Sequence, residues 1–260
     1  MKLNFKKIFS AFSLKIICLL FMTAGIVLIQ LYGGSEGLDL KRVRLGYNIY
    51  YVGVPIACFL VAEGALRTGK IKKYILRLFF AAILTELVFD YARMGNDLFD
   101  FSGGVINHPA LKNSPNFFFT LLFGLICTAV MEYGVSKHFK QGTVRYNLLN
   151  LLIIIAGVAA SYFLNFEHGG IGVLMVIAMY LFHENRILTL IAIAAIQIVL
   201  LGSASGMIMY TPVVGTIFTW FYSGEEGAHN AFTRLLFYSF FPIVFVILVL
   251  MIKTGIGAGI

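Results

Sequence analysis

The sequence predicts an all-α integral membrane protein, a polytopic bundle of about nine transmembrane helices. Of the 260 residues, 60% are hydrophobic and only 12% are charged, whereas soluble domains carry about 25% charged residues. The mean hydropathy is +0.89, and many apolar segments approach the roughly 20 residues that a helix needs to cross a bilayer. Since lipid admits only helices and closed barrels, and no barrel-like alternation is visible, we expect a single transmembrane helical domain over residues 1–260.

The apolar segments are separated by short polar stretches that place the expected helices. The first follows a basic N-terminus and lacks an A-x-A-like cleavage site, so we expect an uncleaved helix rather than a signal peptide. The sixth is short, and the eighth contains Pro212 and Gly215, so both are candidates for re-entrant segments. The longest polar segment covers residues 93–115 and is expected as a structured loop. The expected helices cover residues 14–32, 47–66, 73–92, 116–135, 146–164, 171–182, 187–201, 207–222 and 234–252.

The net charge of +8 is interpreted as a topology signal rather than as a nucleic-acid surface. Lys and Arg gather in short loops, and such loops stay in the cytoplasm. We therefore place the N-terminus in the cytoplasm, although three cations at residues 41–44 argue against it, and we expect lipid as a partner and no nucleic acid. The cytoplasmic set is Lys2, Lys6, Lys7, Arg67, Lys70, Lys72, Lys73, Lys137, Lys140 and Arg145.

The cysteines do not indicate a metal site. Cys18, Cys58 and Cys127 all lie inside apolar segments, and no pair has metal-ligand spacing. No zinc motif and no phosphate-cradling glycine loop is present in the sequence. We interpret the three cysteines as small core residues and expect no metal.

Two acidic residues on the third expected helix are the first candidates for chemistry. Glu86 and Asp90 are four residues apart and therefore share a helix face. Arg93 is close enough to neutralise Asp90, which would make that residue structural. Glu86 lies a turn deeper, where a carboxyl group is costly and usually functional. It is a candidate proton donor or acceptor for catalysis, or for a proton relay in a transporter.

The turn between the second and third helices combines an acid with the densest basic cluster. Glu63 and Arg67 are four residues apart, which fits either a surface ion pair or an orienting carboxylate at a site. The cations at Arg67, Lys72, Lys73 and Arg77 fit either anionic lipid head groups or the phosphates of coenzyme A.

A histidine follows the fifth expected helix, in the turn Glu167-His168-Gly169-Gly170. One interpretation is a polar cap at the membrane interface. The other is a general base, a role that histidine fills more often than any other side chain. Both interpretations of His168 stay open on the sequence alone.

Several stretches of this sequence, among them the region of Glu63, Arg77 and Glu86, resemble the TraX family of bacterial membrane proteins. The strongest similarity lies in residues 54–90, where order and spacing match the family signature. Weaker similarity covers residues 14–17, 116–125, 168–174 and 237–242. The strong block consists of Val54-Pro55-Ile56-Ala57, Val61-Ala62-Glu63-Gly64, Arg67-Thr68, Lys73-Tyr74-Ile75-Leu76-Arg77-Leu78 and Thr85-Glu86-Leu87-Val88-Phe89-Asp90.

The resemblance implies a multi-pass protein of the bacterial cell membrane that transfers an acetyl group from acetyl-CoA to a peptide or small-molecule amine. The family is named for an enzyme that acetylates the N-terminus of a conjugative pilin. Acetyl-CoA is then expected as co-substrate. The cofactor residues would be Arg67, Lys72, Lys73 and Arg77, the catalytic residues Glu86, Asp90, Glu63 and His168, and the substrate contacts Asn116 and Tyr51.

Three departures from the family pattern keep other functions open. Gly25-Ile26 stands where the family usually has Asp-His, Tyr51 where it has Arg, and Val244 where it has His. These changes favour a non-catalytic member that binds, exports or protects against a membrane peptide. A proton-coupled small-solute transporter is the third hypothesis, although such proteins usually show an internal repeat that is not visible here.

Overall fold

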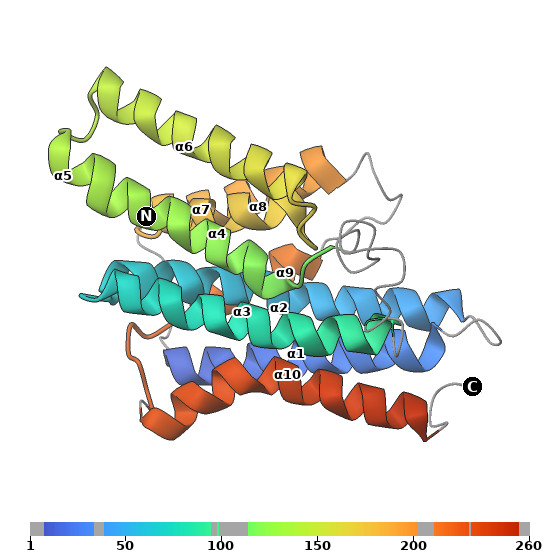
Figure 1. The fold of residues 1–260 in the computed structure, drawn as a ribbon. Helices are drawn as coiled ribbons and strands as arrows, with labels where there is room; N and C mark the ends of the chain where they lie inside the picture. Colours follow the sequence, from blue (N-terminus) through green and yellow to red (C-terminus); the bar gives the residue numbers. More distant parts are fainter. Residues whose placement is uncertain are drawn as a thin grey trace. The chain divides into compact units, whose positions relative to one another are not determined.

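A computed structural model describes residues 8–33, 39–94, 98, 114–201, 211–228 and 230–254 (Figure 1). Residue contacts divide the chain into two compact units, Met1–Leu60 with Phe182–Ile260, and Val61–Leu181. We call them unit 1 and unit 2. The helices are α1 (Ala11–Tyr32), α2 (Leu40–Arg67), α3 (Ile71–Met94), α4 (Phe117–Ala129), the π-helical segment η4 (Val130–Val135), α5 (Ser136–His138), α6 (Val144–Phe163), α7 (Gly169–Leu181), α8 (Arg186–Leu201), α9 (Thr211–Trp220) and α10 (Ala231–Lys253).

The prediction of an all-helical protein is confirmed for the described residues, where the only β pairing is an isolated bridge between Phe9 and Tyr222. With α4, η4 and α5 counted as one, the described chain has nine helical segments in the expected order. Four of them are long and apolar enough to cross a membrane: Ala11–Tyr32, Leu40–Arg67, Phe117–His138 and Val144–Phe163. Nine transmembrane helices are therefore not confirmed.

Three other helices do not reach the length or the hydropathy of a membrane span, for identifiable reasons. At 1.5 Å per residue, α7 with 13 residues and α9 with 10 are about 20 and 15 Å long. The hydrocarbon core of a bilayer is about 30 Å thick. Helix α3 has 24 residues, but its charged side chains lower its hydropathy. The expected break at residues 202–206 and nearly all of the expected loop at 93–115 lie outside the described residues.

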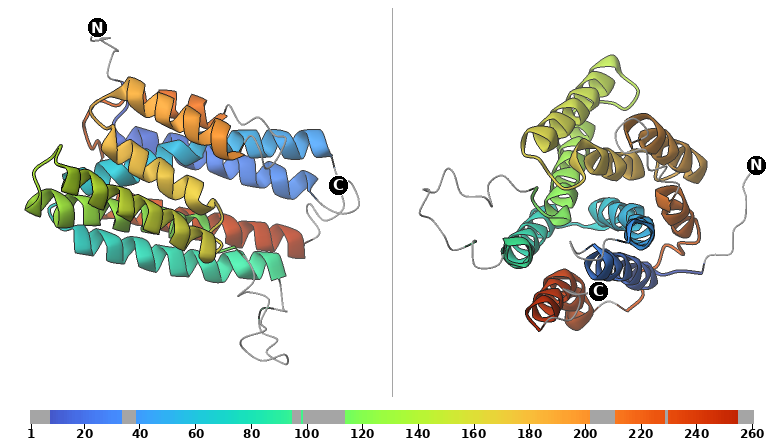
Figure 2. Two further views of the ribbon diagram at one scale, coloured as in Figure 1. Left: turned by 90° about the horizontal axis from the view of Figure 1, so that it is seen from above. Right: turned by 90° about the vertical axis from the view of Figure 1, so that its right-hand side faces the viewer.

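Close helix contacts hold unit 1 together. A Cβ atom on Gly25 of α1 would lie 2.6 Å from the Cβ of Tyr50 on α2, so α1 approaches α2 too closely for a side chain at this position. A Cβ atom on Gly215 of α9 would lie 2.1 Å from the carbonyl oxygen of Val52 on α2, so these two helices also approach closely. Such small-residue contacts are the usual way in which membrane helices pack. Helix α10 lies beside α1, and α8 packs on α9 (Figure 2).

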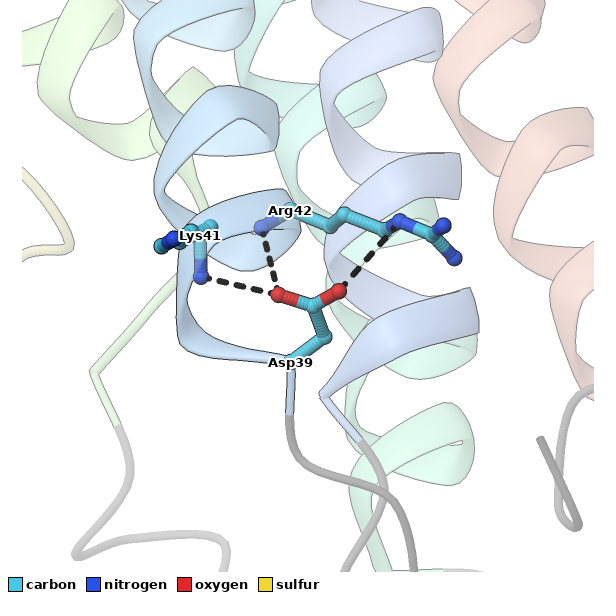
Figure 3. Close-up of polar contacts among 3 residues, drawn as sticks. All are labelled: Asp39, Lys41 and Arg42. Carbon is cyan, nitrogen blue, oxygen red and sulfur yellow. Dashed lines mark hydrogen bonds and ion pairs between the residues drawn. The ribbon is translucent and has the colours of Figure 1, made fainter.

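Helix α2 begins seven residues earlier than predicted, because Asp39 caps it (Figure 3). The Asp39 carboxylate accepts hydrogen bonds from the backbone N–H groups of Lys41 and Arg42, at 3.0 and 3.2 Å. Its other oxygen lies 3.3 Å from the Arg42 guanidinium. The basic cluster at residues 41–44 is thus part of a helix, and one of its cations is paired.

Helix α4 is the centre of unit 2. It contacts α3, α6 and α7, and Figure 1 shows it between α3 and α6. The approach to α7 is close, since a Cβ on Gly124 would lie 2.6 Å from Val176, and one on Gly172 would lie 2.4 Å from Thr120. Gly157 brings α6 against Cys127 in the same way. Two sequence blocks that resemble the family, 116–125 and 168–174, therefore pack against each other.

Candidate functional site

One polar cluster of unit 2 lies where α4 begins, beside the second half of α3. Asn116 is only 2% exposed, and its side-chain oxygen accepts from the N–H of Phe118 to cap α4. Its backbone N–H and its side-chain amide both donate to Glu86 Oε2, at 2.8 and 2.5 Å. The amide also donates to the carbonyl of Ala82 at 2.9 Å. The structure thus brings together a predicted proton carrier and a predicted substrate contact.

Asp90 lies one turn further along α3 and is buried. Immediately before Glu86 in the chain, the buried Thr85 donates to the carbonyl of Ala81 within its own helix. The side chain of Arg93 lies outside the described residues, so its pairing with Asp90 stays a prediction. Of the predicted acidic pair on α3, Asp90 is therefore buried and Glu86 is half-buried.

His168 lies close to this cluster, in the turn between α6 and α7. Its ring meets the ring of Phe117 edge-on, with centroids 4.9 Å apart. The N–H of Glu167 donates to the carbonyl of Pro115, which fixes the turn to the start of α4, and Gly169 adopts φ +48° to begin α7. Burial lowers the pKa of His168 from 6.5 to about 4, so the imidazole is neutral at neutral pH.

The opposite end of α3 carries the basic cluster. Arg67 pairs with Glu63 across one turn of α2, so these two predicted site residues do form a contact. The side chains of Lys70, Lys72, Lys73 and Arg77 are all exposed. Beside Lys72, an apolar groove of about 250 Å³ runs between α3 and α4, lined also by Ile75, Leu76, Phe79, Leu122 and Ile126.

A tyrosine joins the basic turn to the end of α4. The hydroxyl of Tyr133 in η4 donates to the carbonyl of Thr68 at 2.9 Å. The Lys137 ammonium group lies 5.6 Å from the centre of the Tyr133 ring, a favourable cation–π arrangement. Cations from the α2–α3 turn and from α5 therefore share one end of unit 2, which we call the basic end.

The basic end also holds an acidic residue that the sequence interpretation missed. The hydroxyl of Tyr180 on α7 donates to Glu132 Oε2 in η4, at 2.5 Å. Tyr180 is 7% exposed, whereas Glu132 is half-buried. A signal for it was present, because Glu132 is the only charged residue in the segment 116–135.

The predicted site residues therefore fall into separate groups. Lys72 and Glu86 are 14 residues apart on α3, about 21 Å along the helix axis. Glu63 and Arg67 lie at the basic end, while Glu86, Asn116 and His168 gather at the other end of α4. Tyr51 is half-buried in unit 1, with its ring 5.7 Å from that of Tyr50. Their predicted roles remain predictions.

Four apolar helical segments of membrane-spanning length, with the acid Asp90 buried on α3, define a helical membrane protein. A family model described as TraX protein matches residues 10–252. The chain therefore belongs to the TraX family, as the motifs predicted. Searches of curated proteins and of solved structures gave no match.

Proposed function

We propose that this protein is a membrane acyltransferase that moves an acetyl group from acetyl-CoA to an amine of a peptide or small molecule. The observation that carries the proposal is the basic end of unit 2, in a chain of the TraX family. There, Lys70, Lys72 and Lys73 are exposed, and the Tyr133–Thr68 bond holds η4 beside them.

The basic end suits the phosphates of coenzyme A. Lysine ammonium groups bind phosphate as point charges, and several of them in one place add their attraction. Arg67 is already paired with Glu63, which leaves the lysines as the main phosphate contacts. Arg77 lies over the ring of Tyr74, 5.9 Å from its centre, one turn of α3 further in. The proposed phosphate contacts are therefore Lys72 and Lys73, with Arg77 beside them.

The reaction also needs an acceptor for the amine proton. His168 is neutral at neutral pH and is able to accept a proton. However, His168 and Glu86 belong to the cluster at the far end of α3, about 21 Å from Lys72. They serve the reaction only if the long pantetheine arm of the cofactor lies along α3.

The experiment measures coenzyme A binding and acetyl transfer with the purified protein in detergent. Labelled acetyl-CoA is incubated with short peptides that have a free α-amine, and coenzyme A binding is measured by calorimetry. A double variant, Lys72→Ala with Lys73→Ala, should weaken coenzyme A binding at least tenfold. The matched control is Lys140→Ala, which removes an exposed lysine from the α5–α6 loop. Absence of both binding and transfer by the wild-type protein overturns the proposal.

A second candidate is a non-catalytic family member that binds a membrane peptide, and the contact at Gly25 favours it. Gly25 stands where family members usually have the aspartate of an Asp-His pair. A side chain there would collide with Tyr50 and with the carbonyl of Gly46, 2.7 Å away. Helix packing has thus taken the place of a polar group. Tight peptide binding by a wild-type protein that transfers no acetyl group would establish this alternative.

A further inference from the structure

We propose that Glu132 accepts the amine proton in the acyl transfer, and that Tyr180 holds its carboxylate in position. This inference rests on the proposed function and names a catalytic residue for it. It replaces the distant cluster around Glu86 with a carboxylate at the end of unit 2 where the cofactor phosphates are expected. Neither Glu132 nor Tyr180 lies in the sequence blocks that resemble the family.

The position of Glu132 in the helix is unusual. The α-helical hydrogen bonding of α4 gives way at Val130 to a π-helical segment that ends at Val135. Segments of this kind are rare and occur frequently at functional sites, because the extra residue in the turn redirects the side chains. Here the segment contains Glu132, the one charged residue of the stretch 116–135. Charged residues within membrane helices are costly and usually functional.

The contacts of Glu132 leave part of it accessible. Tyr180 donates to Oε2 at 2.5 Å, and Tyr180 itself is buried. Within the described residues, no second hydrogen bond to Glu132 is found. The carboxylate is half-buried, so Oε1 is the oxygen that can face a substrate. One oxygen is thus anchored from inside the helix bundle, which fixes the orientation of the other.

Glu132 belongs to the helical segment that contacts the cations. The next residue, Tyr133, reaches the carbonyl of Thr68 in the basic turn and contacts Lys137. Glu132 is therefore the neighbour, along η4, of the residue that joins both groups of cations. Glu86 in contrast lies about 21 Å from Lys72, and both donors of Asn116 already bind it. Of the two carboxylates, Glu132 is the one placed for a reaction at the basic end.

The chemistry is that of a general base. The neutral amine nitrogen attacks the carbonyl carbon of the thioester while its proton moves to Glu132 Oε1. The carbon–nitrogen bond forms and the carbon–sulfur bond breaks, which gives the acetylated amine and a thiolate. The thiolate then takes the proton back from the Glu132 carboxyl group. The products are the amide and coenzyme A, and Glu132 is returned as a carboxylate.

The test measures thiol release from acetyl-CoA in the presence of a short peptide with a free α-amine. General base catalysis contributes about 10²–10⁴-fold, so Glu132→Gln should lower kcat by about 100-fold or more, with the Kd of coenzyme A unchanged. Tyr180→Phe should lower kcat about tenfold, again without a change in that Kd, which a purely structural bond would not produce. The matched control is Glu184→Gln, an exposed acid in the α7–α8 turn.

The outcomes separate the two proposals. If the wild-type protein transfers acetyl groups and Glu132→Gln does so equally well, the inference is wrong while the proposed function stands. If the wild-type protein neither binds coenzyme A nor releases thiol, both are wrong. Should Glu132→Gln fail to fold, Glu132→Asp decides the matter. It keeps the charge but shortens the side chain, so an unchanged kcat overturns the inference and a reduced kcat with an unchanged Kd supports it.

Discussion

Asn116 donates two hydrogen bonds, from its backbone N–H and from its side-chain amide, to the same carboxylate oxygen of Glu86. The pair links the start of α4 to the second half of α3. It also lies where two separate sequence blocks meet, 54–90 and 116–125. Glu86 therefore has a structural partner, which accounts for its half-buried position on α3.

This pairing predicts a strong coupling between the two residues. Glu86→Ala leaves two donors of Asn116 without an acceptor inside unit 2, and each buried unpaired group costs about 1–3 kcal/mol. Asn116→Ala should be similarly destabilising. The double variant should recover part of the loss, with a coupling free energy of about 0.5–3 kcal/mol. Thermal unfolding in detergent measures all three variants. Strict additivity would show that the two side chains do not depend on each other.

The lowered pKa of His168 predicts a pH-dependent stability. In the folded protein the pKa of His168 is about 4, below its usual 6.5. Between these values the unfolded chain binds the proton first, so unfolding is favoured as the pH falls from about 6.5 toward 4. The Tm of the wild-type protein should therefore fall more steeply over this range than that of His168→Asn. Equal slopes for the two proteins would contradict the prediction.

The sequence was sufficient for the class of fold and for the family, because both depend on apolar segments and on local motifs. It was less reliable at helix ends. The charge of residues 41–44 favours a loop before the second helix. In the structure Asp39 caps α2 ahead of this cluster, so the cluster is helical. The sequence also singled out the sixth and eighth segments as short or re-entrant, and the corresponding helices α7 and α9 are indeed shorter than a membrane span.

The candidate site was harder to predict, because residues of like charge can lie far apart along the same pair of helices. Glu63 and Glu86 were grouped by their charge, yet they lie toward opposite ends of the α2–α3 hairpin. Glu132 was missed because it is a single acid without a partner four residues away. Its partner is Tyr180, 48 residues further along the chain, and no local pattern indicates such a contact.

Close helix packing predicts a sharp cost for a single added methyl group. In Gly124→Ala the new Cβ would lie 2.6 Å from Val176, so α4 and α7 must separate. Overpacking of this kind costs about 1–3 kcal/mol. The control is Gly69→Ala, because no atom lies within 4 Å of the position where its Cβ would be placed. That variant should stay within about 0.5 kcal/mol of the wild type. Equal unfolding temperatures for both variants would contradict this packing.

The cap of α2 allows a test that separates a hydrogen bond from an ion pair. Asp39 accepts from two backbone N–H groups and also pairs with Arg42. Loss of an N-cap costs about 1 kcal/mol, whereas an exposed ion pair contributes little. Asp39→Ala should therefore destabilise the protein by about 1 kcal/mol, and Asp39→Asn, which keeps the cap, by less than about 0.5 kcal/mol. Chemical unfolding in detergent, monitored by circular dichroism, measures both. Equal losses for the two variants would mean that the charge of Asp39, rather than its cap, stabilises α2.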